Sequence, residues 1–257
     1  MNKTCFQRIP LPGRNITLLA VFAGLLIFAC GCSAHRSTPP IPSENNLPPG
    51  FRTLEDAYWW RCRFKHTWPK EGDADLSRDL LLAHAVVSPA LAAHAADIPY
   101  WRFHRRAVRD TAGHQFTFLF YSRPEIAAAV FAEIARSRVL RSAMTANFVE
   151  KVMMDDPDHP KSPDIGETSD PRWSSALRKN WPAFIMGVSS FWLGLIDDGM
   201  NGLPGDGDDP HGLMEKYRGV DAGITEIWRD QGQHALLHHL NAVFGYEEML
   251  IQKAVSF

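Results

Sequence analysis

The sequence predicts an α+β domain that is mostly helical and carries a β-hairpin or a small antiparallel sheet. Residues 101–121 hold two segments of alternating character around a turn, which is the pattern of a hairpin. The segments on both sides carry apolar residues at helical spacing. Hydrophobic residues make up 45% of the chain, enough to build a sizeable core.

The first expected element is a short aromatic helix. Thr53-Leu54-Glu55-Asp56 resembles a helix N-terminal capping pattern. The helix is expected to run to Phe64, before Trp68-Pro69 ends it.

A second helix is expected over Asp75–Ala96, with Pro89 as the point where it kinks or splits. One apolar stripe of this helix consists of Leu76, Leu80, Val87 and Leu91. His84 lies on the same stripe, so we interpret it as a hydrogen-bonded core histidine and not as a ligand.

The clearest β pattern follows this helix. Trp101–Val108 alternates in part, and Asp110-Thr111-Ala112-Gly113 has the composition of a turn. Gln115–Tyr121 then places three phenylalanines on one face, namely Phe116, Phe118 and Phe120. We predict a β-hairpin with one buried face.

A helix and a third strand are expected after the hairpin. Pro124 suits the first turn of a helix that runs to Met144, and residues 147–154 return as a strand. This ββαβ order resembles part of a ferredoxin-like sheet. The alternative is a helical domain that carries one hairpin.

The C-terminal part is expected to be helical after an acidic loop at residues 155–170. Ser169-Asp170-Pro171 starts a helix, and its segment Trp181–Ile196 contains no charged residue. We predict a buried core helix kinked at Pro182, with a membrane-dipping segment as the alternative. A Gly/Asp loop at 197–212 precedes helix to the C-terminus.

The N-terminus has the pattern of an export signal. Three basic residues, Lys3, Arg8 and Arg14, precede an apolar run from Ile16 to Ala29, which is too short to span a membrane. The run ends in Ala29-Cys30-Gly31-Cys32, which resembles a bacterial lipobox. The resemblance implies a signal peptide over residues 1–31 and a palmitate-type lipid anchor. The alternatives are an ordinary signal peptide or a single membrane anchor.

The resemblance implies that Cys32 carries the lipid, with Cys30 as the alternative, because Gly31 precedes Cys32 and the bulky Phe28 stands two residues before Cys30. Residues 32–50 form a Pro/Ser-rich tether, and residues 51–257 form one domain. Ser33, directly after the anchor, implies the periplasmic face of the outer membrane in a Gram-negative host.

Charge and cysteine usage limit the function classes. Loss of three basic leader residues takes the formal charge from −2 to about −5, which argues against nucleic-acid binding. Cys62 would be the only thiol left beside a lipidated Cys32, so no internal disulfide is expected. We interpret Cys62 as a buried residue.

Two groups of polar residues are candidate sites. The first, Arg102, His104 and Arg106, shares one strand face and is suited to an anion, with a solvated sheet face as the alternative. The second is a helical stripe in which His234 and His238 could hold a transition metal. Its acidic members are Glu226 and Asp230. The 197–209 loop is a weaker calcium candidate.

The sequence contains no phosphate-binding glycine loop, nucleophile elbow or paired-cysteine metal motif. We therefore expect an envelope lipoprotein with a non-catalytic binding or scaffolding domain and no cofactor. Its membrane contact is the N-terminal lipid, and its ligand is an envelope protein or an anionic molecule. The alternative is a metal-dependent envelope hydrolase that uses zinc or another transition metal at the 226–238 stripe.

Overall fold

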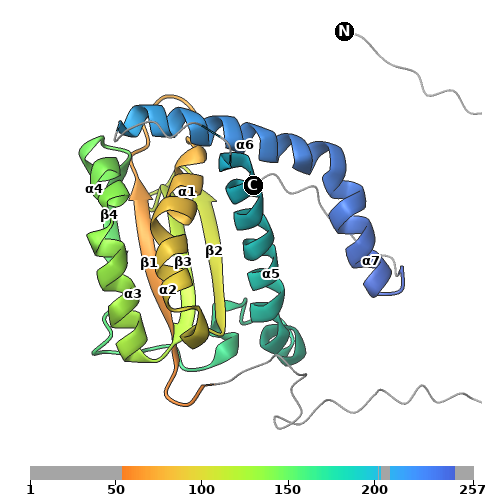
Figure 1. The fold of residues 1–257 in the computed structure, drawn as a ribbon. Helices are drawn as coiled ribbons and strands as arrows, with labels where there is room; N and C mark the ends of the chain where they lie inside the picture. Colours follow the sequence, from red (N-terminus) through yellow and green to blue (C-terminus); the bar gives the residue numbers. More distant parts are fainter. Residues whose placement is uncertain (1–53, 202, 204–208, 247–257) are drawn as a thin grey trace, which may run out of the picture. The chain divides into compact units, whose positions relative to one another are not determined.

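A four-stranded antiparallel sheet is the central element of the computed structural model, which describes residues 54–201, 203 and 209–246 (Figure 1). Its strands are β1 (Tyr58–His66), β2 (Tyr100–Ala107), β3 (His114–Ser122) and β4 (Val149–Met154). They lie in the order β2-β3-β1-β4. The predicted hairpin is confirmed as β2 and β3.

Two helical segments connect the strands. The first is a continuous run of α1 (Ser77–Leu81), the π-helical η1 (Leu82–Val87) and α2 (Ser88–Ala93). The second consists of α3 (Pro124–Arg136) and α4 (Arg138–Thr145). The resulting βαββαβ order and strand order are those of a ferredoxin-like fold. The predicted ββαβ part is therefore the last four of the six elements of a complete unit.

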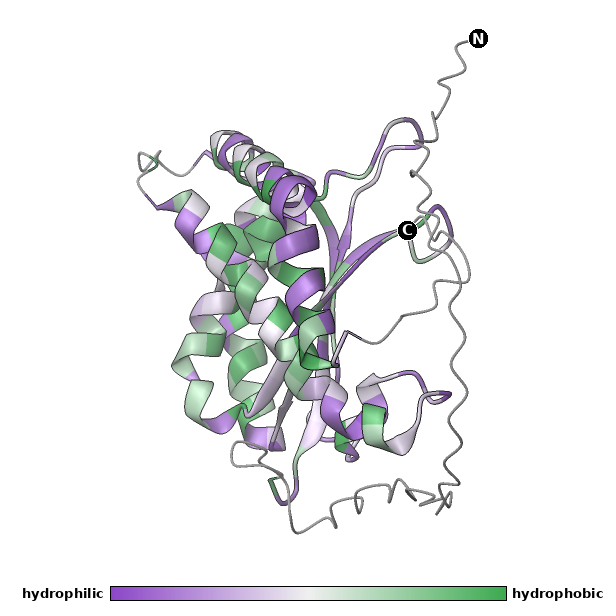
Figure 2. Ribbon diagram, turned by 90° about the vertical axis from the view of Figure 1, so that its right-hand side faces the viewer, coloured by the Kyte–Doolittle hydropathy of each residue, from purple (hydrophilic) through white to green (hydrophobic). Residues whose placement is uncertain are grey.

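The main core lies between the sheet and these helices. Alternate residues of β1 and β3 face it in register, pairing Trp60 with Phe120 and Phe64 with Phe116. The predicted face of phenylalanines is confirmed, since all three are fully buried. Burying one side chain of this size stabilises the folded state by about 1.5–3 kcal/mol relative to leaving it exposed. Figure 2 shows hydrophobic positions concentrated on the helices beside the sheet.

The predicted helix ending at Phe64 is wrong, because this segment is strand β1. Its side chains alternate between the core and the opposite face, so Trp60, Cys62, Phe64 and His66 are buried while Arg61 and Arg63 are half-exposed. Aromatic residues favour such a strand. Glu55 and Asp56, the last two residues of the capping-like pattern, form a turn instead, with Asp56 at a φ of 54°.

The predicted helices at 75–96 and 124–144 are confirmed with local changes. A short 3-10 segment, η2 (Ala95–Asp97), follows α2, and Pro89 lies in the first turn of α2, directly after the π-helical segment. The second helix is split at Ser137, which leaves the helical conformation and caps α4 by accepting a 3.2 Å hydrogen bond from the Leu140 N–H.

The C-terminal part forms α5 (Ser175–Met200), α6 (Pro210–Gly232), the π-helical η4 (Gln233–His238) and α7 (His239–Val243). Helix α5 lies along the edge strand β2, and α6 packs against α1, α4 and α5 (Figure 1). Within the described ranges, no helix combines the length and apolar character that a membrane span requires.

Helix α5 corrects the prediction of a buried core helix. It starts at Ser175, later than predicted, and Pro182 lies inside it. Only one stripe is buried, and the opposite stripe exposes Phe184, Val188 and Phe191 by nearly half. The charge-free segment therefore contributes apolar surface as well as core.

A smaller core covers part of the other sheet face. Trp59 and Tyr121 pack there against η3 (Ile165–Thr168) and the N-terminal half of α5. The Trp59 indole donates a 3.0 Å hydrogen bond to the Ile165 carbonyl, and the Tyr121 hydroxyl donates one of 3.1 Å to the Pro163 carbonyl. Polar side chains occupy the remaining part of this face.

Candidate functional site

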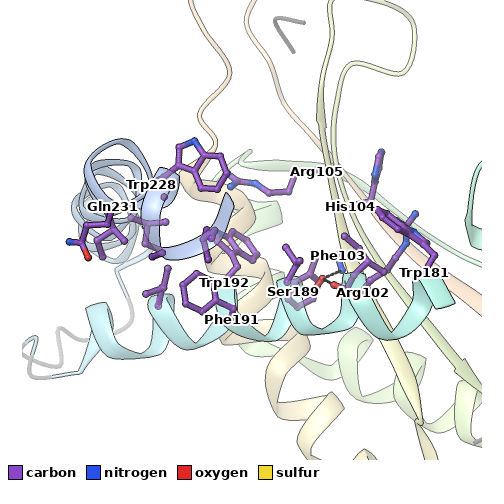
Figure 3. Close-up of a pocket in the computed structure, with 18 residues that line it drawn as sticks. Arg102, Phe103, His104, Arg105, Trp181, Ser189, Phe191, Trp192, Trp228 and Gln231 are labelled. Carbon is purple, nitrogen blue, oxygen red and sulfur yellow. Dashed lines mark hydrogen bonds between the residues drawn. The ribbon is translucent and has the colours of Figure 1, made fainter. Parts of the chain in front are cut away.

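An apolar groove lies between α5, the C-terminal half of α6 and the edge strand β2. Its volume is about 770 Å³, within the range of small-molecule sites. Three tryptophans line it, Trp181 and Trp192 from α5 and Trp228 from α6 (Figure 3). Its other apolar lining residues include Ile185, Val188, Phe191, Leu195, Ile224, Ile227, Ala235 and Leu236.

The walls of the groove remain open to solvent. Phe191 is 49% exposed and Trp228 is 60% exposed. Helices α5 and α6 thus expose large apolar side chains toward the groove. Exposed apolar patches of this kind often mark binding sites on proteins. The sequence indicated the apolar character of α5 through its charge-free run, but it did not indicate that α6 would supply a second wall.

The polar residues of the groove come from strand β2. Arg102 and His104 line the groove beside α5 (Figure 3). The Nε of Arg102 is buried and has no hydrogen-bond partner in the part of the chain that the structure describes. Burial and then the neighbouring charge of Arg61 lower the pKa of Arg102. Among the described residues, no carboxylate forms an ion pair that compensates its positive charge.

The predicted sharing of a face by Arg102, His104 and Arg106 agrees with the strand register. They lie opposite Leu119, Thr117 and Gln115 of β3, away from the main core. Arg106 is already paired, because its Nη1 donates a 3.0 Å hydrogen bond to Asp110. Burial and the charges of Arg102 and Arg106 lower the pKa of His104. Arg102 is thus the member best placed to bind an anion.

A second polar site is buried in the main core. His66 at the end of β1, Asp79 in α1 and His114 at the start of β3 bring their polar atoms together. The Nε2 atoms of His66 and His114 lie 2.9 Å and 3.0 Å from the same oxygen, Oδ1 of Asp79. All three side chains are at most 1% exposed.

Arg105 holds the other carboxylate oxygen of Asp79. Its Nε donates a 2.8 Å hydrogen bond to Oδ2, and its Nη2 donates one of 2.9 Å to the Leu76 carbonyl. Burial alone would raise the pKa of Asp79, but contacts with His114 and His66 and the Arg105 charge hold it well below its usual value. Burial also lowers the pKa of His66, which favours neutral imidazole.

This buried group was not predicted from the sequence. Because a helix ending at Phe64 was predicted here, it was not seen that His66 follows Trp60, Cys62 and Phe64 on one strand face. The alternation itself could have placed His66 in the core. Its pairing with Asp79 depends on how α1 crosses the sheet, which no local pattern encodes.

The predicted metal stripe near the C-terminus lies on a solvent-facing surface. Glu226, Asp230, His234 and His238 are all exposed. The rings of His234 and His238 stack at 5.2 Å between centroids. Among the described residues, a convergence of three or more metal-donor atoms occurs at His66, Asp79 and His114 instead. The stripe stays a prediction with less geometric support.

His84, Cys62 and Asp209 each have contacts or burial that the fold itself explains. His84 accepts or donates a 2.8 Å hydrogen bond with the Tyr217 hydroxyl, as expected for a hydrogen-bonded histidine. Cys62 is fully buried, as predicted. In the proposed calcium loop, Asp209 caps α6 through a 3.1 Å hydrogen bond from the His211 N–H, and residues 204–208 lie outside the described part.

The lipidation candidates Cys32 and Cys30 also lie outside the described residues, as do the leader and the tether. No protein-family model matches the chain. No curated protein and no solved structure matches it at a significant level. The geometry of the groove and of the buried cluster is therefore the basis for proposals about function.

Proposed function

We propose that this chain is an exported bacterial lipoprotein whose folded domain binds an anionic amphiphile, such as a fatty acid. The lipobox-like leader supports the anchor at Cys32, and the Pro/Ser-rich tether at 32–50 supports a domain held near a membrane. In a Gram-negative host, Ser33 favours the periplasmic face of the outer membrane. Membrane lipids are then the ligands nearest to the domain.

The observation that carries the proposal is an apolar groove whose lining includes Arg102, and the Nε of Arg102 has no hydrogen-bond partner in the described part of the chain. Side chains from α5 and α6 form the apolar walls, and Arg102 comes from the edge strand β2 beside α5. Burying an acyl chain stabilises binding by about 0.8 kcal/mol for each CH₂ group. A chain of ordinary length therefore gains most of its binding free energy from the walls.

The anionic headgroup is expected at Arg102. The Nε of this residue is buried without an acceptor in the described part of the chain, and Arg61 lies nearby. A carboxylate can accept two parallel hydrogen bonds from one guanidinium. A bound carboxylate would thus provide the negative charge that Arg102 lacks among the described residues. The groove would therefore bind a fatty acid more tightly than the neutral ester of the same acyl chain.

The test uses the full chain in nanodiscs of zwitterionic lipid and a photoactivatable palmitic acid. After irradiation, mass spectrometry locates the label in peptides of the chain. We expect labelling within α5 and α6, and weaker labelling by the methyl ester of the same probe. Arg102→Gln should make acid and ester equal, because it removes the charge that distinguishes them.

A matched pair of valines gives the control. Val188 lines the groove and is 46% exposed, while Val108 lies at the hairpin turn and is 49% exposed. Val188→Asp should strongly reduce labelling because a carboxylate would face the acyl chain, and Val108→Asp should leave labelling unchanged. Equal labelling of both variants, or labelling spread over the whole chain, would contradict the proposal.

A further inference from the structure

The buried histidines and Asp79 meet in a way that ordinary hydrogen bonding leaves incomplete. The Nε2 of His66 lies 2.9 Å from Asp79 Oδ1, yet neither ring nitrogen of His66 has hydrogen-bond geometry with a partner in the described residues. His114, in contrast, is hydrogen bonded to the same oxygen. Buried polar atoms without a partner are rare and call for an explanation, such as an ion.

A shared metal ion accounts for this arrangement. A ligating imidazole directs its lone pair at the metal and not at the neighbouring ligand, so the short distance without hydrogen-bond alignment at His66 is expected between two ligands. His114 would exchange its hydrogen bond to Asp79 Oδ1 for a bond to the ion. One ligand atom from each of His66, Asp79 and His114 lies within 4.8 Å of the other two, which is compatible with one ion between them.

The surroundings of Asp79 also suit a ligand carboxylate. Arg105 holds Oδ2 at 2.8 Å and leaves Oδ1 to the two histidines. Outer hydrogen bonds of this kind orient metal-ligating carboxylates. The cluster is fully buried, and its three members come from β1, α1 and β3. An ion there would tie helix α1 to two neighbouring strands of the sheet.

We propose that His66, Asp79 and His114 bind a zinc ion that stabilises the fold. Two imidazoles and one carboxylate form a donor set typical of zinc, whereas calcium and magnesium prefer oxygen donors. The three donors fill three of the four positions that zinc usually takes, and a water molecule would take the fourth. None of its three ligands lines the apolar groove or belongs to the 226–238 stripe, although Arg105, which holds Asp79, also lines the groove.

The test measures metal in the full chain, purified in detergent without a histidine tag. After zinc loading and dialysis, elemental analysis should find about one zinc ion per chain. His66→Asn and His114→Asn should each lose most of this metal. His234→Asn and His238→Asn serve as matched controls, because they change histidines of the exposed stripe, and they should retain it.

A second measurement covers the case in which the core variants do not fold. In the wild-type chain, zinc removal by a chelator should lower the Tm, and zinc readdition should restore it, because a ligand that binds only the folded state stabilises it. Replacement of zinc by cobalt should give the visible absorption of a tetrahedral site.

Wild-type chain that retains no metal and has a zinc-independent Tm would overturn the proposal. Loss of zinc in the stripe variants would overturn it too, because the ion would then lie at that stripe. Photolabelling of the groove in the wild-type chain tests the proposed lipid binding independently of the zinc measurements.

Discussion

The backbone N–H of Phe103 donates a 3.1 Å hydrogen bond to the Oγ of Ser189. Phe103 lies in the edge strand β2, and Ser189 lies on the buried stripe of α5. The Ser189 hydroxyl also donates a 2.8 Å hydrogen bond to the Ile185 carbonyl. One side chain therefore joins the helix to the sheet edge, supplying a partner that an edge strand otherwise lacks.

We expect Ser189→Ala to destabilise the domain by about 1–3 kcal/mol, because the Phe103 N–H would lose its acceptor in a buried position. Ser190→Ala is the matched control, since Ser190 is exposed on the same helix, and it should change little. Urea unfolding followed by circular dichroism measures both. Equal midpoints for the two variants would show that the contact does not hold the edge strand.

The second prediction concerns the thiol of Cys62. This side chain is fully buried between the sheet and the helices, and burial raises the pKa of the thiol far above its ordinary value. The thiolate, which is the reactive form, is therefore scarce. We expect a maleimide to modify Cys62 slowly in the native chain and rapidly in urea. Equal rates under both conditions would contradict a fully buried thiol.

The third prediction concerns the membrane anchor. Cys32→Ala should abolish metabolic labelling by a fatty acid, because only a thiol at the anchor position accepts the diacylglycerol. Cys30→Ala is the control and should remain labelled. The reverse pattern would move the anchor to Cys30, and labelling of a variant that lacks both cysteines would remove the lipoprotein proposal.

Local patterns predicted much of the fold. Turn residues 110–113 and the alternating phenylalanines of β3 fixed the hairpin, because side chains of a strand alternate between its faces. Pro124 marked the start of α3 correctly. The prediction at β1 failed because the capping-like pattern suggested a helix, whereas the side chains from Trp60 to His66 alternate as in a strand.

The candidate sites were harder to predict because they depend on contacts between distant segments. Arg102 was identified from its strand face, but Trp181 and Trp228, which line the same groove, lie far along the chain on two helices. His66 and Asp79 were not linked, since only the packing of α1 against the sheet brings them together. Sequence periodicity assigns a face to each residue, but it does not assign a partner.

The last prediction concerns Asp221, a half-buried carboxylate in α6. Burial raises its pKa, the Arg105 charge 3.9 Å away opposes this rise, and the charges of Asp79 and Asp75 add to it. A carboxyl whose pKa is higher in the folded state binds its proton more tightly there. Its ionisation therefore costs stability as the pH rises through the folded pKa.

Asp221→Asn should consequently raise the Tm at pH 7, because the amide keeps the shape of the side chain without the charge. The gain should shrink as the pH falls, and it should vanish below the ordinary carboxyl pKa of about 3.9, where the wild-type group is protonated in both states. Glu226→Gln, an exposed change on the same helix, should show no such pH-dependent gain. Differential scanning calorimetry across this pH range measures the effect. A lower Tm for Asp221→Asn at pH 7 would mean that the contact with Arg105 outweighs the burial of the charge.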